Sequence, residues 1–535
     1  MRRFLLSLGL VLGLCATGAR ADLDPAALKG LASDDFDAKQ AAITQLAAAG
    51  DADAERVLKA LADDALAVAG GRVVITAGAQ VLDAASGAAL KLAPANPESI
   101  GLNNALRQQV DGALAALRLF SADRTERLAA AKSLLADMGD GATLLPILDK
   151  AVQAETDGEI KPILAQLHAQ ARLTSPDAAA RLAAVQTLGE SSSPAVKALL
   201  LPLIEKQGDA YLETDDKVRY AAQTAIKSIE GRLAWSETAG QIFTGVSLGS
   251  ILLLAALGLA ITYGVMGVIN MAHGELLMIG AYSAYAMQTL FRASFPDFVD
   301  YYLVAAVPVA FFVAALVGMA MERTVIRHLY GRPLETLLAT WGLSLVLIQA
   351  ARLLFGAQNV EVANPVWMSG GVQIAENLSL PWNRLVIVAF SGFVLLLVWL
   401  MMNKTRLGMF VRAVTQNRPM AGCVGVPTAR IDTLAFGIGS GIAGLGGVAL
   451  SQIANVGPDM GTGYIVDSFM VVVLGGVGQL AGAVWAALGL GVVSKFLEGW
   501  AGAVIAKILV LVFIIIFIQK RPQGLFALKG RFVEN

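Results

Sequence analysis

The sequence predicts an all-α protein in two parts, an exported helical-repeat domain followed by a polytopic α-helical membrane domain. Of its 535 residues, 56% are hydrophobic, and the mean hydropathy of +0.62 is too high for an ordinary soluble protein. The long apolar runs are confined to the second part. Residues 22–240 carry 21 Lys and Arg against 30 Asp and Glu, a net charge of −9, whereas residues 241–535 carry 17 against 12, a net charge of +5. The chain therefore joins two physically different bodies.

Residues 1–21 have the pattern of an export signal. Arg2 and Arg3 precede an apolar core over residues 4–14, and Ala19-Arg20-Ala21 forms an A-x-A cleavage pattern. The core is too short to span a membrane, although retention as an uncleaved anchor is the alternative. A lipoprotein signal at Cys15 is disfavoured because bulky Leu14 precedes it. Cys423 is the other cysteine, so we expect an exported segment without disulfides.

Residues 22–235 are predicted to form a periplasmic α-helical, HEAT-like repeat domain. Ser33, Ser121 and Ser175 occupy equivalent positions in three copies of a repeat. A related motif begins at the same distance after each of these serines. The three copies are AAITQL (41–46), AAAKSL (129–134) and AAVQTL (183–188). Helical units of this kind bury their apolar stripe only against their neighbours. The β-branched residues of 72–78, with Ser86-Gly87 in 79–90, predict a small strand pair inserted between the first two copies. The segment contains no catalytic constellation, so we expect a scaffold or a docking surface.

Residues 236–535 are predicted to form the membrane domain, because most of their apolar stretches are long enough to cross a bilayer. These stretches are 242–262, 274–291, 302–321, 336–356, 384–402, 431–453, 467–492 and 501–518. Basic residues gather in 323–332, in 403–430 and in the C-terminal tail, whereas 357–383 holds Glu361 and Glu376 and no base. The positive-inside rule places the basic segments and the C-terminus in the cytoplasm.

This orientation conflicts with a simple count of eight spans. A chain that enters from the exported side and ends in the cytoplasm crosses the membrane an odd number of times. We expect 467–492 to be the exception, because Gly475, Gly476 and Gly478 favour a broken or re-entrant helix. The alternative is a re-entrant turn at 270–275. Elsewhere, the small-xxx-small spacings of 437–447 predict close helix packing.

The sequence Asn-Met-Ala-His-Gly-Glu at 270–275 places Asn270, His273 and Glu275 within an apolar, glycine-rich stretch. Hydrocarbon cannot satisfy such groups, so polar clusters inside a membrane usually face a path or a partner. Two interpretations are open. The cluster either lies near a solute path, or it occupies a short hydrated loop between two helices.

Five blocks of the membrane part resemble the integral-membrane permeases of the branched-chain amino acid class of ABC importers. They are GVSLGSILLLAALGLAITYGVMGVINMAHGELLMIGAY (245–282), ERTVIRHLYGRPLETLLATWGLSLVLIQ (322–349), TRLGMFVRAVTQNRPMAGCVGVPTARI (405–431), VLGGVGQLAGAV (473–484) and RPQGLF (521–526). The resemblance runs through nearly all of residues 241–530. With its exported extension, the chain resembles the first permease subunit of urea ABC transporters, which implies an inner-membrane protein that forms part of the path for urea.

The resemblance implies that the chain works with other subunits. These are a second permease, two ATP-binding subunits and a periplasmic solute-binding protein. The sequence independently permits this, because it contains no G-x-x-x-x-G-K-[ST] phosphate loop. Residues 412–426 resemble the coupling helix that docks on the ATPase, and the expected contacts are Arg412, Thr415, Gln416, Asn417, Arg418 and Met420. In that helix Val414, Met420 and Val424 would form an apolar face, while Arg412, Gln416 and Arg418 stay solvated.

Urea is small and neutral, so its path should offer hydrogen-bond donors and acceptors in a narrow cavity. The candidate residues are Asn270, His273, Glu275, Thr340 and Ser344, the last two of which are four apart and so on one helix face. Glu275 could instead pair with Lys495 or Lys507. The alternative functions are a permease for branched-chain amino acids or short amides, and a stand-alone solute channel. An enzyme is disfavoured, because His168, His273 and His328 are far apart in the sequence, and we expect no cofactor, metal or nucleic acid.

Overall fold

The computed structural model describes residues 23–49, 52–77, 80–90, 98–138, 141–208, 210–375 and 377–526. The predicted export signal and Cys15 lie outside these residues. The chain divides into two compact units, Met1–Leu233 and Ala234–Asn535, which are considered separately below.

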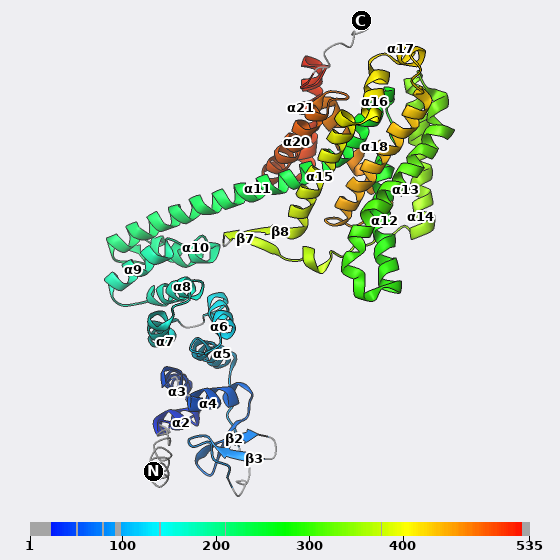
Figure 1. Ribbon diagram of the computed structural model, residues 1–535. Coiled ribbons are helices and arrows are strands. Elements are labelled where there is room, and N and C mark those ends of the chain that lie inside the picture. The colour runs from blue at the N-terminus through cyan, green and yellow to red at the C-terminus, as the bar shows by residue number, and fades with distance from the viewer. Residues whose placement is uncertain are drawn as a thin grey trace, which may run out of the picture. The chain divides into compact units, whose positions relative to one another are not determined.

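The first unit is built mainly from short helices with two small antiparallel sheets (Figure 1). Its helices are α2 (Pro25–Leu31), α3 (Phe36–Ala49), α4 (Ala52–Ala62), α5 (Asn104–Arg118), α6 (Arg124–Ala136), α7 (Gly141–Ala154), α8 (Ile160–Arg172), α9 (Ala178–Leu188), α10 (Pro194–Leu200), η1 (Leu201–Ile204) and the start of α11 (Asp216–Met266). The three predicted repeat motifs lie in α3, α6 and α9. Ile43, Ala131 and Val185, which share one motif position, are each 0% exposed.

A salt bridge recurs at the start of the repeated helices. Asp123 and Asp177 cap α6 and α9, and the arginine four residues later pairs with a buried glutamate. Arg127 Nε donates to Glu155 at 2.9 Å, and Arg181 Nε donates to Glu213 at 2.8 Å. Each arginine also donates to backbone carbonyls just before its own helix. It therefore connects the start of that helix to the loop that carries the glutamate.

The structure reveals a fourth copy of this pattern at the start of α11, which the three serines did not indicate. Asp215 accepts from the backbone N–H of Lys217 at 2.8 Å, Arg219 follows four residues later, and AAQTAI (221–226) has the offset of the other motifs. Gln223 takes the position of the three fully buried residues above, and it is exposed. A polar residue at that position is typical of a terminal repeat, which has no further neighbour to pack against. The HEAT-like assignment itself stays a prediction.

The predicted strand pair is confirmed and belongs to a larger antiparallel sheet. The strands are β1 (Leu66–Ala69), β2 (Arg72–Ala77), β3 (Gln80–Asp83) and β4 (Glu98–Ser99), in the order β3-β2-β1-β4. A separate two-stranded pair, β5 (Lys206–Gln207) with β6 (Ala210–Tyr211), precedes α11.

The second unit consists mainly of long apolar helices. Its helices are the later part of α11, α12 (His273–Ser294), α13 (Tyr302–Thr324), α14 (Pro333–Phe355), α15 (Trp382–Lys404), the two short helices α16 (Arg406–Gln416) and α17 (Arg418–Cys423), α18 (Thr428–Ser451), α19 (Met460–Gly475), α20 (Leu480–Ala501) and α21 (Ala503–Lys520). Short connections are η2 (Pro296–Tyr301), η3 (Ile326–Leu329), η4 (Val366–Met368) and a hairpin of β7 (Gly371–Ala375) with β8 (Leu378–Pro381). Among the described residues, seven helices are long and apolar enough to cross a membrane, and α12 and α19 are not among them.

The predicted break in the glycine-rich stretch 467–492 is confirmed. α19 ends at Gly475, α20 begins at Leu480, and Gly476 and Gly478 between them have φ of +99° and +76°. Glycine adopts such left-handed backbone without steric cost. A Cβ on Gly482 would lie 1.9 Å from the carbonyl oxygen of Gly475, so the two helix ends meet backbone to backbone. The stretch is therefore one short helix and one potential span.

Small residues bring the central helix α18 into close contact with α12 and α13, as their spacing predicts. A Cβ on Gly447 would lie 1.9 Å from the carbonyl oxygen of Leu277, and one on Gly444 would lie 2.7 Å from that of Ala310. Neither position can accept a larger residue without separating the helices. Van der Waals contact of this kind is what holds helices together in a membrane.

The basic connecting segments of the second unit lie together at one end of the unit. The Arg418 guanidinium lies 4.2 Å from the ring centre of Tyr330, so two of the basic segments meet at one end. Figure 1 shows α17 and the end of α21 at the upper end of this unit, and β7 and β8 lower down. In the loops away from the basic end, Val360 and Val456 form an isolated antiparallel bridge, with N–H···O distances of 2.8 Å in both directions.

Candidate functional site

The polar cluster lies where the chain turns back into the second unit. α11 ends at Met266, residues 267–272 are not helical, and α12 begins at His273. His273 Nε2 lies 3.0 Å from the carbonyl oxygen of Ala255. Ala255 precedes the end of α11 by about 16 Å, at roughly 1.5 Å per residue. α12 therefore starts beside the middle of the apolar part of α11, well inside the bundle.

All five predicted path residues are buried at this turn. The exposed fraction is 0% for His273, Glu275 and Thr340, 2% for Asn270 and 4% for Ser344. This burial argues against the interpretation of the cluster as a hydrated loop, although a short non-helical connection, residues 267–272, does join the two helices. After the turn the chain continues as α12, which packs against α14, α18 and α19. These helices surround the turn and bury its polar side chains.

The structure brings the two halves of the predicted path together. Ser344 donates a hydrogen bond of 2.9 Å to Glu275 Oε1. Thr340 accepts from the backbone N–H of Met271 at 3.2 Å, and Asn270 accepts from that of Ala272 at 3.1 Å. Thr340 and Ser344 therefore fix the turn and the first residues of α12 against α14.

Three polar atoms of the cluster have no hydrogen-bond partner among the described residues. They are Asn270 Nδ2, His273 Nδ1 and Glu275 Oε2, all buried. Because His273 Nε2 faces a carbonyl oxygen, that nitrogen carries the proton and Nδ1 is an acceptor. The cluster thus offers an amide donor and two acceptors, the imidazole nitrogen and a carboxylate oxygen. Leaving such atoms unpaired costs about 1–3 kcal/mol each, which favours a polar ligand or water.

Two helices begin side by side at this site. A Cβ on Gly274 in α12 would lie 2.5 Å from the carbonyl oxygen of Gly461 in α19, and one on Gly461 would lie 2.3 Å from that of Gly274. Helix starts inside a membrane protein carry unsatisfied N–H groups and a partial positive charge. Glu275 therefore lies in the first turn of one helix and next to the first turn of another.

Neither candidate base pairs with Glu275. Lys495 binds Glu498 three residues along α20, and Lys507 Nζ lies 3.4 Å from Asp467 Oδ2. The alternative in which Glu275 pairs with one of these lysines is therefore wrong, because each lysine pairs with another carboxylate.

The predicted coupling segment forms α16 and α17. On α17, Met420 is 61% exposed, and Val424 just beyond it is 72% exposed, as expected for a docking surface. Arg412 and Gln416 are exposed, Thr415 donates to its own helix backbone, and Asn417 caps α17 by accepting from Met420 N–H at 3.0 Å.

Two expectations for this segment are wrong. Val414 is 3% exposed and packs into the unit, because it lies on the inner face of α16. Arg418 is not simply solvated, since it forms an ion pair with Asp432 and covers the ring of Tyr330. It therefore stabilises the loop itself.

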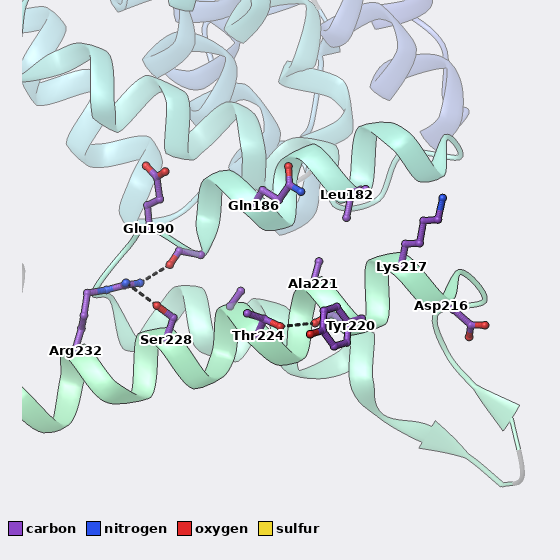
Figure 2. A pocket seen from close by; sticks show the side chains of 12 residues that line it. Leu182, Gln186, Glu190, Asp216, Lys217, Tyr220, Ala221, Thr224, Ser228 and Arg232 are labelled. Carbon is purple, nitrogen blue, oxygen red and sulfur yellow. Dashed lines mark hydrogen bonds between the residues drawn. The ribbon is translucent and has the colours of Figure 1, made fainter.

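The first unit contains a groove of about 660 Å³ between α9 and the start of α11. Figure 2 shows Arg232 on α11, donating to Ser228 and to a backbone carbonyl, and Tyr220 nearer the start of the same helix. Tyr220 is 74% exposed. Within the described part of the chain, no group of three metal-ligating residues occurs in either unit.

The comparisons with known proteins concern the second unit. A family described as branched-chain amino acid transport system / permease component matches residues 241–518. The high-affinity branched-chain amino acid transport permeases BraD of Pseudomonas aeruginosa and LivH of Salmonella typhimurium are 29% and 30% identical, over 53% of this chain and 94% of their own. A probable branched-chain amino acid permease LivH of Methanocaldococcus jannaschii is 24% identical, over 52% of this chain and 88% of its own. No solved structure matches.

Proposed function

Because this chain belongs to the family of branched-chain amino acid permease components of ABC importers, we propose that it forms part of the path for urea across the inner membrane. The second unit is the permease body, and the chain is a transport subunit. ATP hydrolysis is assigned to two separate ATP-binding subunits, and solute delivery to a periplasmic binding protein. A second permease completes the path.

The orientation follows from the charges. The basic segments 323–332 and 403–430 meet through Arg418 and Tyr330, and the positive-inside rule assigns that end to the cytoplasm. The first unit would then lie in the periplasm. α17 would be the coupling helix, because its exposed Met420 and the nearby Val424 give an ATPase an apolar surface at the cytoplasmic end.

The observation that supports urea is the set of unpaired atoms beside the Glu275–Ser344 hydrogen bond. Glu275 Oε2 and His273 Nδ1 accept, and Asn270 Nδ2 donates. Urea carries two NH₂ donors and one carbonyl acceptor, the complementary set. The Glu275 carboxylate has no base beside it among the described residues, so the N–H groups of a solute can donate to its free oxygen.

A second solute has separate support. The relatives named above are permeases for branched-chain amino acids, and they match the unit that would form the path. Their length corresponds to the second unit alone, and the family match leaves residues 1–240 outside. That extension is what favours urea within the class.

The test is uptake by the complete importer reconstituted in liposomes. Labelled urea and labelled leucine are each offered with and without ATP inside, and each is competed by the other unlabelled. We expect ATP-dependent uptake of urea that excess leucine does not inhibit. Solute movement by the chain alone, without ATPase subunits, would contradict the importer and favour a channel. ATP-dependent uptake of leucine alone would replace urea by the second solute.

A further inference from the structure

The permease unit contains a second polar site, apart from the Glu275 cluster. A cavity of about 210 Å³ lies between α11, α19, α20 and α21, and we call it the α19–α21 cavity. Its polar lining consists of Asp467, Ser494, Glu498 and Lys507, and every other residue of the lining is apolar.

Asp467 and Lys507 form a loose ion pair in this cavity. Lys507 Nζ lies 3.4 Å from Asp467 Oδ2 and 3.4 Å from the carbonyl oxygen of Gly463. Charge-assisted hydrogen bonds are usually about 2.7–2.9 Å long, so neither contact is tight. Glu498 is instead bound by Lys495 of its own helix. Asp467 and Lys507 are therefore the charged groups that a ligand of the cavity would meet.

The cavity lies at the end of the unit away from the basic C-terminal tail. That tail returns to the break between α19 and α20, because the backbone N–H of Leu525 donates to the carbonyl oxygen of Leu474 at 2.8 Å. α20 runs from the break to Gly502, and α21 runs back from there to Lys520. The turn at Gly502 is therefore at the opposite end, which the proposed orientation assigns to the periplasmic surface.

The charged lining lies close to that membrane surface. Glu498 and Lys507 are four and five residues from Gly502 in the sequence, which is about 6–8 Å along a helix. The headgroup layer of a bilayer is roughly 5–8 Å thick on each side. Trp500, next to the turn, is 83% exposed, and tryptophan is enriched where a membrane meets water. The charged groups of the cavity are therefore at the depth of lipid headgroups.

The polarity of the lining changes with depth in the same sense on three helices. On each helix a polar residue lies nearer the Gly502 end of the unit than an apolar one. The pairs, polar residue first, are Asp467 and Met470 on α19, Ser494 and Leu490 on α20, and Lys507 and Val510 on α21. A ligand that matches this gradient has a charged end at the membrane surface and an apolar end toward the bilayer centre.

We propose that the α19–α21 cavity binds the headgroup of a zwitterionic membrane phospholipid that carries a primary ammonium group. The ammonium group binds Asp467, the phosphate binds Lys507, and the first part of an acyl chain contacts the apolar lining. The lipid reaches the cavity from the bilayer, because Val504 and Ile508 beside Lys507 are exposed apolar residues of a potential span. The proposal goes beyond the proposed importer function and uses its orientation alone.

The charges of the cavity select among lipid headgroups. A lipid that separates Asp467 from Lys507 must replace both halves of their contact, because an unpaired charge is costly where water is scarce. A primary ammonium group donates N–H hydrogen bonds to a carboxylate, whereas a trimethylammonium group has no N–H to donate. An anionic headgroup without an ammonium group would bring a phosphate to the cavity and leave Asp467 without a cation. The expected ligand is therefore phosphatidylethanolamine.

The experiment measures lipid binding to the purified complete importer by native mass spectrometry, which also reports whether the complex is intact. The delipidated complex is titrated with phosphatidylethanolamine, phosphatidylcholine and phosphatidylglycerol that carry the same acyl chains. We expect the wild type to prefer phosphatidylethanolamine to each of the other two by about tenfold or more, as for hydrogen bonds to charged groups. Phosphoethanolamine, the same headgroup without chains, should not displace the lipid at equal concentration, because it lacks the apolar part.

Two substitutions assign the groups individually. Asp467→Asn should abolish the preference for phosphatidylethanolamine over phosphatidylcholine, because it removes the acceptor for the ammonium group. Lys507→Gln should weaken the binding of both lipids and keep the preference, because both carry the phosphate. Glu335→Gln is the matched control, since it removes a carboxylate from the exposed Arg332–Glu335 pair outside the cavity, and it should bind lipids as the wild type does.

Equal binding of the three lipids by the wild type would overturn the proposal, whatever the variants do. An Asp467→Asn complex that keeps the wild-type preference would also overturn it, and displacement by phosphoethanolamine would show that a soluble zwitterion is the ligand. Uptake by the same preparation tests the importer separately. ATP-dependent uptake of urea without a preference for phosphatidylethanolamine leaves the importer standing and removes the lipid site.

Discussion

Ser344 in α14 donates a hydrogen bond of 2.9 Å to Glu275 in α12, across 69 positions of the sequence, and both side chains are almost fully buried. The bond fixes one carboxylate oxygen and leaves the other without a partner among the described residues. This arrangement orients a single acceptor inside the permease unit.

Glu275→Gln tests whether that acceptor serves transport. Glutamine keeps the size of the side chain and an oxygen for Ser344, so the complex should assemble in normal amounts. Loss of the carboxylate should lower uptake by about tenfold, since one buried hydrogen bond to a charged group contributes roughly 1.5–3 kcal/mol. Uptake per assembled complex is measured. Wild-type uptake by a correctly assembled variant would remove Glu275 from the path.

The contact between Gly274 and Gly461 is predicted to be essential for the packing of α12 against α19. In Gly274→Ala, the new Cβ would meet the Gly461 carbonyl oxygen at 2.5 Å, so the two helix starts must separate. We expect a lower melting temperature of the purified complex and reduced uptake. Gly463→Ala, also in α19, is the control. Its Cβ meets nothing within 4 Å, and alanine favours helix over glycine. Equal effects of the two substitutions would refute the packing argument.

The coupling surface can be tested apart from the stability of its loop. Met420→Asp places a charge on the exposed apolar surface of α17, and it should reduce co-purification of the ATPase subunits about tenfold or more. Because Met420 is 61% exposed, the permease itself should fold normally. Retained co-purification would refute docking at Met420.

The arginines of the same segment should behave differently from each other. Arg418→Glu places a carboxylate beside Asp432 and removes the guanidinium from Tyr330, so it should lower the yield of folded permease. Arg412 is exposed and contacts only Asn403 at 3.2 Å among the described residues, so Arg412→Glu should affect ATPase binding alone. Yield in detergent and ATPase co-purification separate the two effects.

Parts of this architecture could be read from the sequence, because they depend on local rules. Gly475, Gly476 and Gly478 fall within four positions of one apolar stretch, which favours a helix break there, and the small-residue spacing of α18 permits close helix contact. The position of Glu275 was recognisable as unusual because a carboxylate interrupts an apolar stretch.

The remaining features depend on contacts between distant segments. No local pattern shows that Ser344 lies beside Glu275, or that Arg418 pairs with Asp432. Asp467 and Lys507 were visible as charges in apolar helices, but their pairing required the arrangement of α19 and α21. The fourth repeat copy carried a readable signal, an aspartate followed four residues later by arginine. The copy was not found from the serines, because the fourth copy has Glu213 in place of the serine.

The stability of the first unit should fall in acid because of its recurring Arg–Glu pairs. Hydrogen bonding from Arg181 holds the pKa of Glu213 below its ordinary value of 4.5, and the Glu213 side chain is 4% exposed. A carboxyl group with a lowered folded-state pKa stabilises the fold above the unfolded-state pKa. That stabilisation is lost as the pH falls from about 4.5 through the lower folded-state pKa.

Glu213→Gln should remove this pH dependence and weaken α9 and the start of α11 at neutral pH. Breaking a buried pair leaves Arg181 without its carboxylate, which costs about 3–5 kcal/mol. Hydrogen exchange of α9 peptides in the full-length chain, compared with the wild type at each pH, measures both effects. The difference between the two proteins should be largest at pH 7 and shrink below about pH 4.5. Asp34→Asn, at an exposed acidic residue, should exchange as the wild type does throughout. A difference that stays constant down to pH 3 would show that Glu213 acts through packing, because its charge would then contribute nothing.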